Sequence, residues 1–182
     1  MKLLSDTLEF VKEENGWSCS ADPGEPGYDS KLKRWSVGGT EARLLSELFR
    51  GLTVLEIGTG LGVSTRGIAT TAVLVHTIDI DPWVKKHVAP DLPENVVFHD
   101  SREFIPKVDA TFIDGLHTYE QCCLDMEFAK EKTKPGGLIV LHDFNGKEIQ
   151  DAIGEANLFG FQIVTGAGMA LLWNDEIRRD NG

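Results

Sequence analysis

The sequence has little of several features, and each scarcity excludes a class of protein. It contains three cysteines, two of them adjacent at Cys122 and Cys123, which gives no disulfide framework and predicts free thiols in a reducing cytoplasm. No apolar run approaches the roughly 18 residues that a membrane span needs. The first six residues turn polar too early for a signal peptide. We therefore expect a cytoplasmic protein without a membrane partner.

Basic side chains are also scarce, because 18 Lys and Arg residues face 29 Asp and Glu residues, for a net charge of −11. Proteins that coat nucleic acid carry a basic surface, so we expect no nucleic acid among the partners. Internal repeats are absent too. A chain of 182 residues is long enough for one domain with a full core.

The first 39 residues differ from the rest. Leu3–Glu14 has the apolar spacing of a helix, and Asn15–Gly39 is a loop rich in Gly, Pro, Ser and Asp. Long loops in compact domains are often functional. We expect residues 1–39 to belong to the same domain and to be a candidate lid over a ligand-binding domain at 40–182. Thr40 is the expected N-cap of a helix that runs to Phe49.

Strand and helix patterns then alternate. The expected strands are Thr53–Ile57, Leu74–Asp79, Val96–His99, Ala110–Ile113 and Leu138–His142, and the expected helices are Val63–Thr70, Pro82–Val88, Thr118–Lys132 and Lys147–Asn157. This alternation predicts an α/β fold, a mainly parallel sheet with helices on both faces. Phe161–Thr165 and Met169–Trp173 predict a terminal hairpin, which makes the last strand antiparallel.

The most informative stretch is Val54–Thr65, where an apolar strand leads to an acid, three glycines at alternate positions and a helix start. This pattern predicts a nucleotide-type cofactor site at the first strand-to-helix turn. The carboxylate of Glu56 would repel the pyrophosphate of a dinucleotide. It suits the ammonium and sulfonium of S-adenosylmethionine.

Two further strand ends carry residues suited to the rest of such a cofactor. Asp79 lies about 20 residues after the glycine turn, where an acid binds ribose hydroxyls, although it could be an ordinary turn acid. Ile80 would then lie against the adenine. Asp81 before Pro82 is typical of a helix N-cap. Asp100 and Ser101 either hydrogen-bond the adenine edge or cap the next turn.

The fourth and fifth strands bring two carboxylates and two imidazoles to the same rim, at Asp114, His117, His142 and Asp143. Carboxylates at adjacent strand ends suit a hard divalent cation such as Mg²⁺, which would lower the pKa of a substrate hydroxyl. His117 could remove the hydroxyl proton, or it could be a capping residue at the helix start. His142 is the more structural of the two histidines.

These motifs resemble the class I S-adenosylmethionine-dependent methyltransferases. They are most similar to methyltransferase domain 24, a branch of small-molecule and sugar O-methyltransferases related to catechol O-methyltransferases. The resemblance covers roughly residues 36–173. It implies a Rossmann-like doubly wound sheet of seven strands, mainly parallel with an antiparallel C-terminal strand, and O-methylation of a hydroxylated small molecule.

The resemblance also implies a role for each matching residue. The methionine part of the cofactor falls to Glu56, Gly58, Gly60 and Gly62, with Ser64 at its carboxylate and Val37 and Gly38 on the approaching loop. Asp79 matches the ribose acid, with Ile80 beside it, and Asp100 and Ser101 match the adenine contacts. Asp114 is expected at the cofactor and, with Asp143, at Mg²⁺. Asp114 and His117 are the expected catalytic residues, with His117 as the general base. Phe144 departs from the family, because the catechol-type enzymes have an asparagine ligand there and Asn145 is shifted by one.

Two other functions stay open. The chain could be a catalytically inactive cofactor-binding module or partner subunit with a methyltransferase fold. A dehydrogenase is disfavoured by Glu56 and by the glycine spacing. Either the Asn15–Gly39 loop or a second subunit of a homo-oligomer could cover the site, or nothing covers it.

Overall fold

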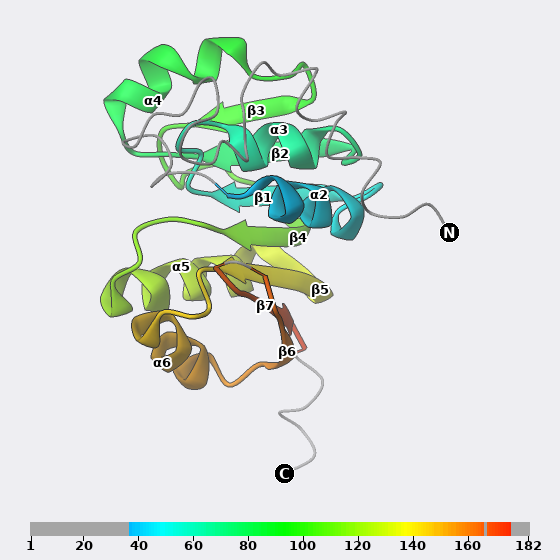
Figure 1. Cartoon of the computed structure of the whole chain (residues 1–182). Coiled ribbons are helices and arrows are strands. Elements are labelled where there is room, and N and C mark those ends of the chain that lie inside the picture. Colours follow the sequence, from blue (N-terminus) through cyan, green and yellow to red (C-terminus); the bar gives the residue numbers. More distant parts are fainter. Residues whose placement is uncertain (1–36, 166, 176–182) are drawn as a thin grey trace, which may run out of the picture.

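The computed structural model describes residues 37–165 and 167–175. These residues form one seven-stranded sheet flanked by helices on both faces (Figure 1). The strands are β1 Thr53–Ile57, β2 Leu74–Ile78, β3 Val96–His99, β4 Val108–Ile113, β5 Thr133–His142, β6 Phe159–Ile163 and β7 Met169–Trp173. The helices are α2 Gly39–Leu48, α3 Val63–Ala69, α4 Pro82–His87, α5 Tyr119–Lys132 and α6 Lys147–Ala156, with a 3₁₀ turn, η2, at Ala89–Asp91.

The strand order is β3-β2-β1-β4-β5-β7-β6. The first five strands in this order run parallel, and β7 runs antiparallel between β5 and β6. The expected fold class is therefore confirmed, including the terminal hairpin. Its first strand begins at Phe159, two residues before the expected start.

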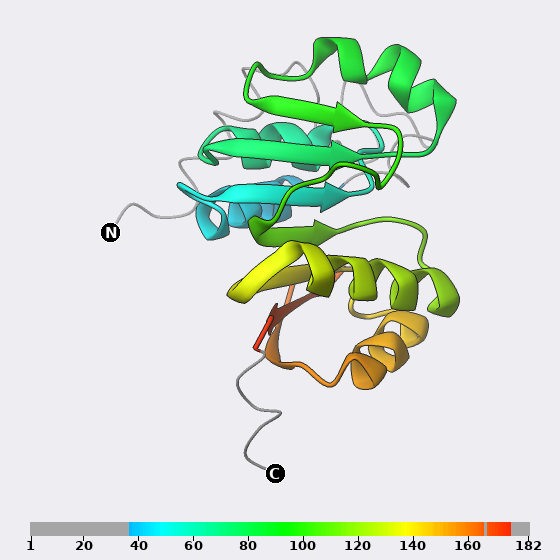
Figure 2. The ribbon, with the colours of Figure 1, turned by 180° about the vertical axis from the view of Figure 1, so that it is seen from behind.

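The central strands are apolar on both sides because helices cover both faces of the sheet. In β1, Val54 and Leu55 point to opposite faces and both are fully buried. Val54 belongs to a core under α2 and α3, whereas Leu55 belongs to a second core under α5 and α6. Figure 2 shows α5 from this second side.

The starts of α2 and β5 differ from the sequence-based expectation. The N-cap of α2 is Gly38 rather than Thr40, because the Glu41 carboxylate accepts the Gly38 N–H at 2.9 Å and closes the first turn. Strand β5 begins at Thr133 rather than Leu138. The Pro-Gly-Gly segment at residues 135–137 is an irregularity inside β5, since Val108 pairs with Thr133 while Ala110 pairs with Leu138.

Several expectations concern residues outside the described part of the chain. They include the helix at Leu3–Glu14, almost all of the loop at Asn15–Gly39, and thus the candidate lid. Within residues 37–165 and 167–175, the helices are too short or too polar to cross a membrane.

The parallel strands place their carboxyl ends at one edge of the sheet. Backbone hydrogen bonds continue past the ends of the strands: the Gly58 N–H donates to Ile78 O and the Asp114 N–H donates to Ile57 O, each at 2.9 Å. These bonds hold the residues that follow β1, β2 and β4 side by side. Parallel α/β sheets bind ligands at this edge.

Candidate functional site

The turn between β1 and α3 contains three glycines with positive φ, at +99° for Gly58, +50° for Gly60 and +74° for Gly62. Other residues rarely adopt these angles. A Cβ at Gly58 would also lie 2.2 Å from the backbone oxygen of Asp114. The glycine turn therefore packs directly against the end of β4, and only glycine permits that approach.

Glu56 is fully buried beneath this turn. Its carboxylate accepts hydrogen bonds from the hydroxyls of Ser64 at 2.5 Å, Thr65 at 2.5 Å and Thr77 at 2.6 Å. Burial raises the pKa of Glu56 to about 7, against the lowering effect of the three hydroxyls.

This burial corrects the electrostatic argument made from the sequence. The Glu56 carboxylate is covered, and with a pKa near 7 it is partly neutral at physiological pH, so its repulsion of a pyrophosphate is weaker than expected. The Ser64 hydroxyl, which was expected to meet the carboxylate of the cofactor, donates to Glu56 instead. Contact of Glu56 and Ser64 with the methionine part stays a prediction.

Asp79 lies half-buried at the end of β2. One carboxylate oxygen accepts the Gly60 N–H and the other accepts the Asp81 N–H, each at 2.9 Å. Asp79 is thus fixed beside the glycine turn, as a ribose ligand requires. Its neighbour Ile80 is 84% exposed, and Asp81 caps α4 through the Trp83 N–H, as expected.

Asp100 and Ser101 are exposed after β3. Asp100 forms an ion pair with Lys85, whose hydrogen bond lowers the pKa of this carboxyl. The Ser101 hydroxyl accepts the Glu103 N–H at 3.4 Å. Ser101 therefore makes the turn contact that the sequence left as an alternative to binding adenine.

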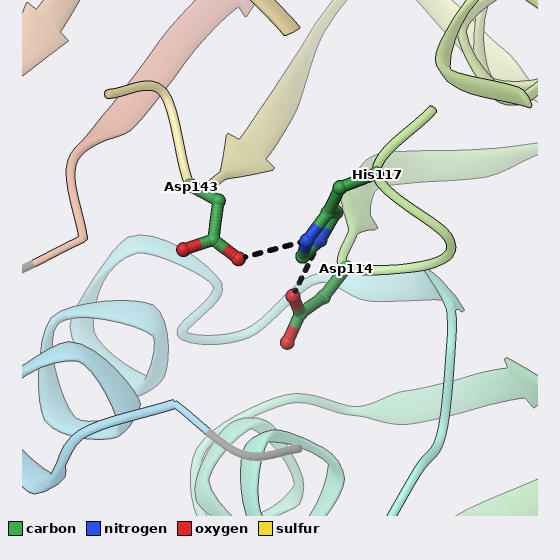
Figure 3. Close-up of side chains that lie close together, drawn as sticks. All are labelled: Asp114, His117 and Asp143. Atoms are coloured by element: carbon green, nitrogen blue, oxygen red, sulfur yellow. Dashed lines mark ion pairs between the residues drawn. The ribbon is translucent and has the colours of Figure 1, made fainter. Parts of the chain in front are cut away.

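Asp114, His117 and Asp143 converge after β4 and β5 (Figure 3). His117 Nε2 lies 3.4 Å from Asp114 Oδ1, and His117 Nδ1 lies 3.1 Å from Asp143 Oδ2. Asp143 has φ +56°, a left-handed conformation that Asp tolerates better than most residues. The imidazole of His117, 40% exposed, therefore has one carboxylate at each ring nitrogen.

His142 and Glu41 extend this group into the protein. His142 Nδ1 lies 3.1 Å from Asp114 Oδ1 and 3.2 Å from Asp143 Oδ2, and its Nε2 lies 3.1 Å from Glu41 Oε2. His142 and Glu41 are only 6% and 5% exposed. We call these five residues, Glu41, Asp114, His117, His142 and Asp143, the carboxylate–imidazole cluster.

Charge pairing determines the protonation of the cluster. Burial acts to raise the pKa of Asp114, but hydrogen bonds from His117 and His142 outweigh it and the pKa lies below its usual value. The hydrogen bond to Asp114 raises the pKa of His117. Burial lowers the pKa of His142, yet its carboxylate partners reverse this and raise it far above the usual value. Both imidazoles are therefore stabilised as cations.

Asp114, His117 and Asp143 have ligand atoms within 4.8 Å of one another, which is the spacing of a metal site. The donor set fits Mg²⁺ poorly, because Mg²⁺ prefers oxygen ligands and His117 lies between the carboxylates. The side-chain oxygen of Asn145, the residue after Phe144, lies against Gly168. It is 2.8 Å from the position that a Cβ on Gly168 would take. In this arrangement the residues do not form the expected Mg²⁺ site.

The sequence-based reasoning missed Glu41. An acid at the third position of α2 is the only local signal, and it indicates helix capping rather than a site. His142 is buried, as a structural role predicts, but its ring also contacts both aspartates.

Comparisons with known proteins concern the family and the fold. A family model described as a methyltransferase domain, of the methyltransferase 24 family, matches residues 55–144. No curated protein sequence matches the chain.

Solved structures share the fold at low identity. The N-methyltransferase NodS from Bradyrhizobium japonicum is 16% identical, with a TM-score of 0.60 over 81% of this chain and 99% of that one. The tRNA methyltransferase TrmI from Aquifex aeolicus is 15% identical, with a TM-score of 0.60 over 76% and 70%. A Klebsiella pneumoniae protein provisionally described as an O-methyltransferase is 17% identical, with a TM-score of 0.58 over 96% and 91%. Residues 55–144 therefore match the methyltransferase 24 family, and the chain has the fold of S-adenosylmethionine-dependent methyltransferases.

Proposed function

We propose that this protein transfers a methyl group from S-adenosylmethionine to a hydroxyl oxygen of a small molecule. The observation that carries the proposal is the partly exposed His117 ring, held between the carboxylates of Asp143 and of Asp114, whose backbone packs against the glycine turn. Removing a proton from a hydroxyl needs a base, and imidazole is the commonest one. The likeness to the Klebsiella pneumoniae protein supports O-methylation. The other two similar proteins are described as an N-methyltransferase and a tRNA methyltransferase.

The edge of the sheet suits S-adenosylmethionine in three places. We assign the methionine part to the glycine turn, with Gly58, Gly60, Gly62, Glu56 and Ser64, and to Val37 and Gly38 at the start of α2. Asp79 is the ribose ligand, Ile80 the adenine-facing apolar residue, and Asp100 and Ser101 the adenine contacts. We place Asp114 beside the methionine part of the cofactor, because its backbone oxygen lies against Gly58 of the glycine turn.

S-adenosylmethionine supplies a methyl group already activated on a sulfonium. The protein therefore acts mainly by orienting the acceptor and by taking its proton. The acceptor oxygen would take the methyl group as S-adenosylhomocysteine leaves. The hydroxyl proton would go to the His117 ring nitrogen that faces Asp143, the more exposed of the two carboxylates, once the acceptor hydroxyl replaces that carboxylate there. The two aspartates hold the ring and stabilise the imidazolium that results.

Proton uptake by His117 depends on pH. Because its pKa is raised, part of the protein carries an already protonated His117 at neutral pH, and the rate should rise as pH increases. Because His117 lies between the carboxylates of Asp114 and Asp143, these residues fit Mg²⁺ poorly, and the proposed reaction uses no metal.

Calorimetric titration with S-adenosylmethionine, and separately with NAD, tests the cofactor. We expect micromolar binding of S-adenosylmethionine alone, and binding of NAD alone would refute the proposal. Release of S-adenosylhomocysteine is then measured over a panel of hydroxylated small molecules, with Mg²⁺ or with EDTA. Activity in EDTA excludes the metal. Cofactor binding without product from any acceptor would instead favour the inactive binding module.

A further inference from the structure

Glu41 receives more hydrogen bonds than a helix cap needs. Its Oε2 accepts from the Gly38 N–H at 2.9 Å and from His142 Nε2 at 3.1 Å. Its Oε1 accepts from the Thr165 hydroxyl at 2.6 Å and from the Ala167 N–H at 3.2 Å. The donors come from three separate segments: the start of α2, the end of β5 and the loop between β6 and β7.

Four donors fix the Glu41 carboxylate in one orientation, and that orientation fixes the ring of His142. The other ring nitrogen of His142 faces Asp114 Oδ1 and Asp143 Oδ2. Those are the two atoms that contact His117. An unbroken series of contacts therefore runs from Gly38 through Glu41, His142 and the aspartates to His117.

We propose that Glu41 is a positioning residue that couples the segment at Val37 and Gly38 to the carboxylates that orient His117. This inference rests on the proposed function, in which that segment approaches the cofactor and His117 serves the acceptor. Capping alone uses only the bond to Gly38. Burying a carboxylate is costly unless its partners compensate, and here a cationic imidazole does so.

The test compares Glu41→Gln, which keeps the shape of the side chain, with Glu47→Gln. Glu47 lies on the same helix, but it is partly exposed and contacts Arg50, so it is the matched control for charge. The imidazole ¹H–¹⁵N resonances of His117, assigned with His117→Asn, are measured in each protein. We expect them to shift in Glu41→Gln, although Glu41 does not touch His117, and to stay unchanged in Glu47→Gln. The dissociation constant for S-adenosylmethionine should rise about tenfold in Glu41→Gln only.

Unchanged His117 resonances in folded Glu41→Gln would overturn the coupling. If Glu41→Gln does not fold, Thr165→Val removes one donor from the same carboxylate, and it must shift the His117 resonances relative to the wild-type protein or the inference fails. Failure of the proposed function gives a different result. In that case the wild-type protein does not bind S-adenosylmethionine, independently of any shift in the His117 resonances.

Discussion

At the scale of single residues, two buried glutamates show how partners control charge. Glu56 receives three neutral hydroxyls, and burial prevails, so its pKa rises to about 7. Glu41 is also buried, but hydrogen bonds from His142, Thr165 and Gly38 outweigh burial and lower its pKa to about 2. Among the lowering effects on the pKa of Glu41, the hydrogen bond from His142 is the largest, because it stabilises the ionised form directly. Glu41 thus belongs to the charged cluster, and Glu56 supports the glycine turn.

Asp79→Ala should weaken binding of S-adenosylmethionine by roughly 10- to 100-fold, the scale of one or two lost charge-assisted hydrogen bonds. The variant removes the proposed ribose acceptor and frees the Gly60 N–H. Titration calorimetry measures the change. Asp151→Ala, which removes an exposed acid paired with Lys147 on α6, is the control. Wild-type affinity in folded Asp79→Ala would exclude Asp79 from the ribose site.

His117→Ala should slow methyl transfer by roughly 10²- to 10⁴-fold at saturating cofactor. In the wild-type protein the rate should increase as pH rises through a pKa above the usual 6.5 of histidine, because the base form appears only there. The variant should lose this dependence. Release of S-adenosylhomocysteine between pH 6 and 9 measures both effects, and His87→Ala on α4 is the control. A wild-type pH profile in His117→Ala would remove His117 from the mechanism.

At the scale of elements, the close approach of the β1–α3 turn to β4 determines where the site forms. A Cβ at Gly58 would meet the Asp114 backbone, whereas a Cβ at Gly51, also at positive φ, would meet nothing within 4 Å. The close approach of the β1–α3 turn to the end of β4 thus depends on the absence of a side chain at Gly58.

Gly58→Ala should therefore destabilise the fold and weaken cofactor binding, whereas Gly51→Ala should show only the cost of an unfavourable φ, about 1 kcal/mol. Urea unfolding gives both free energies, and the difference between the variants measures the contact with β4. Equal losses in the free energy of unfolding for the two variants would mean that the β1–α3 turn tolerates a side chain at position 58.

For the whole molecule, a ligand that binds only the folded state raises the midpoint of thermal unfolding. S-adenosylmethionine at 100 times its dissociation constant should raise the free energy of unfolding by about 2.7 kcal/mol. For a chain of this length that corresponds to a rise of roughly 5–10 °C. Scanning calorimetry with NAD at the same concentration should show no rise. A larger shift with NAD would reverse the choice of cofactor.

Much of the fold was predictable because its signals are local. Each of the five central strands was expected within a few residues, and the glycine turn, Asp79, Asp114 and Asp143 all lie at the expected edge. The start of β5 was missed, because a Pro-Gly-Gly segment normally ends a strand and here it is accommodated inside one. The expectations for the first 36 residues concern a part of the chain that the structure does not describe.

The sequence by itself determined the alternation of strands and helices in an α/β sheet and the side chains at its carboxyl edge, since periodicity and glycine spacing act over short distances. Only the tertiary structure decided which of them touch. Glu41 lies 101 positions from His142 and 124 from Thr165, and no local pattern joins residues so far apart. The burial of Glu56 and the place of His117 between two carboxylates likewise depend on packing between elements. Packing therefore determined the charges at the site as well as its shape.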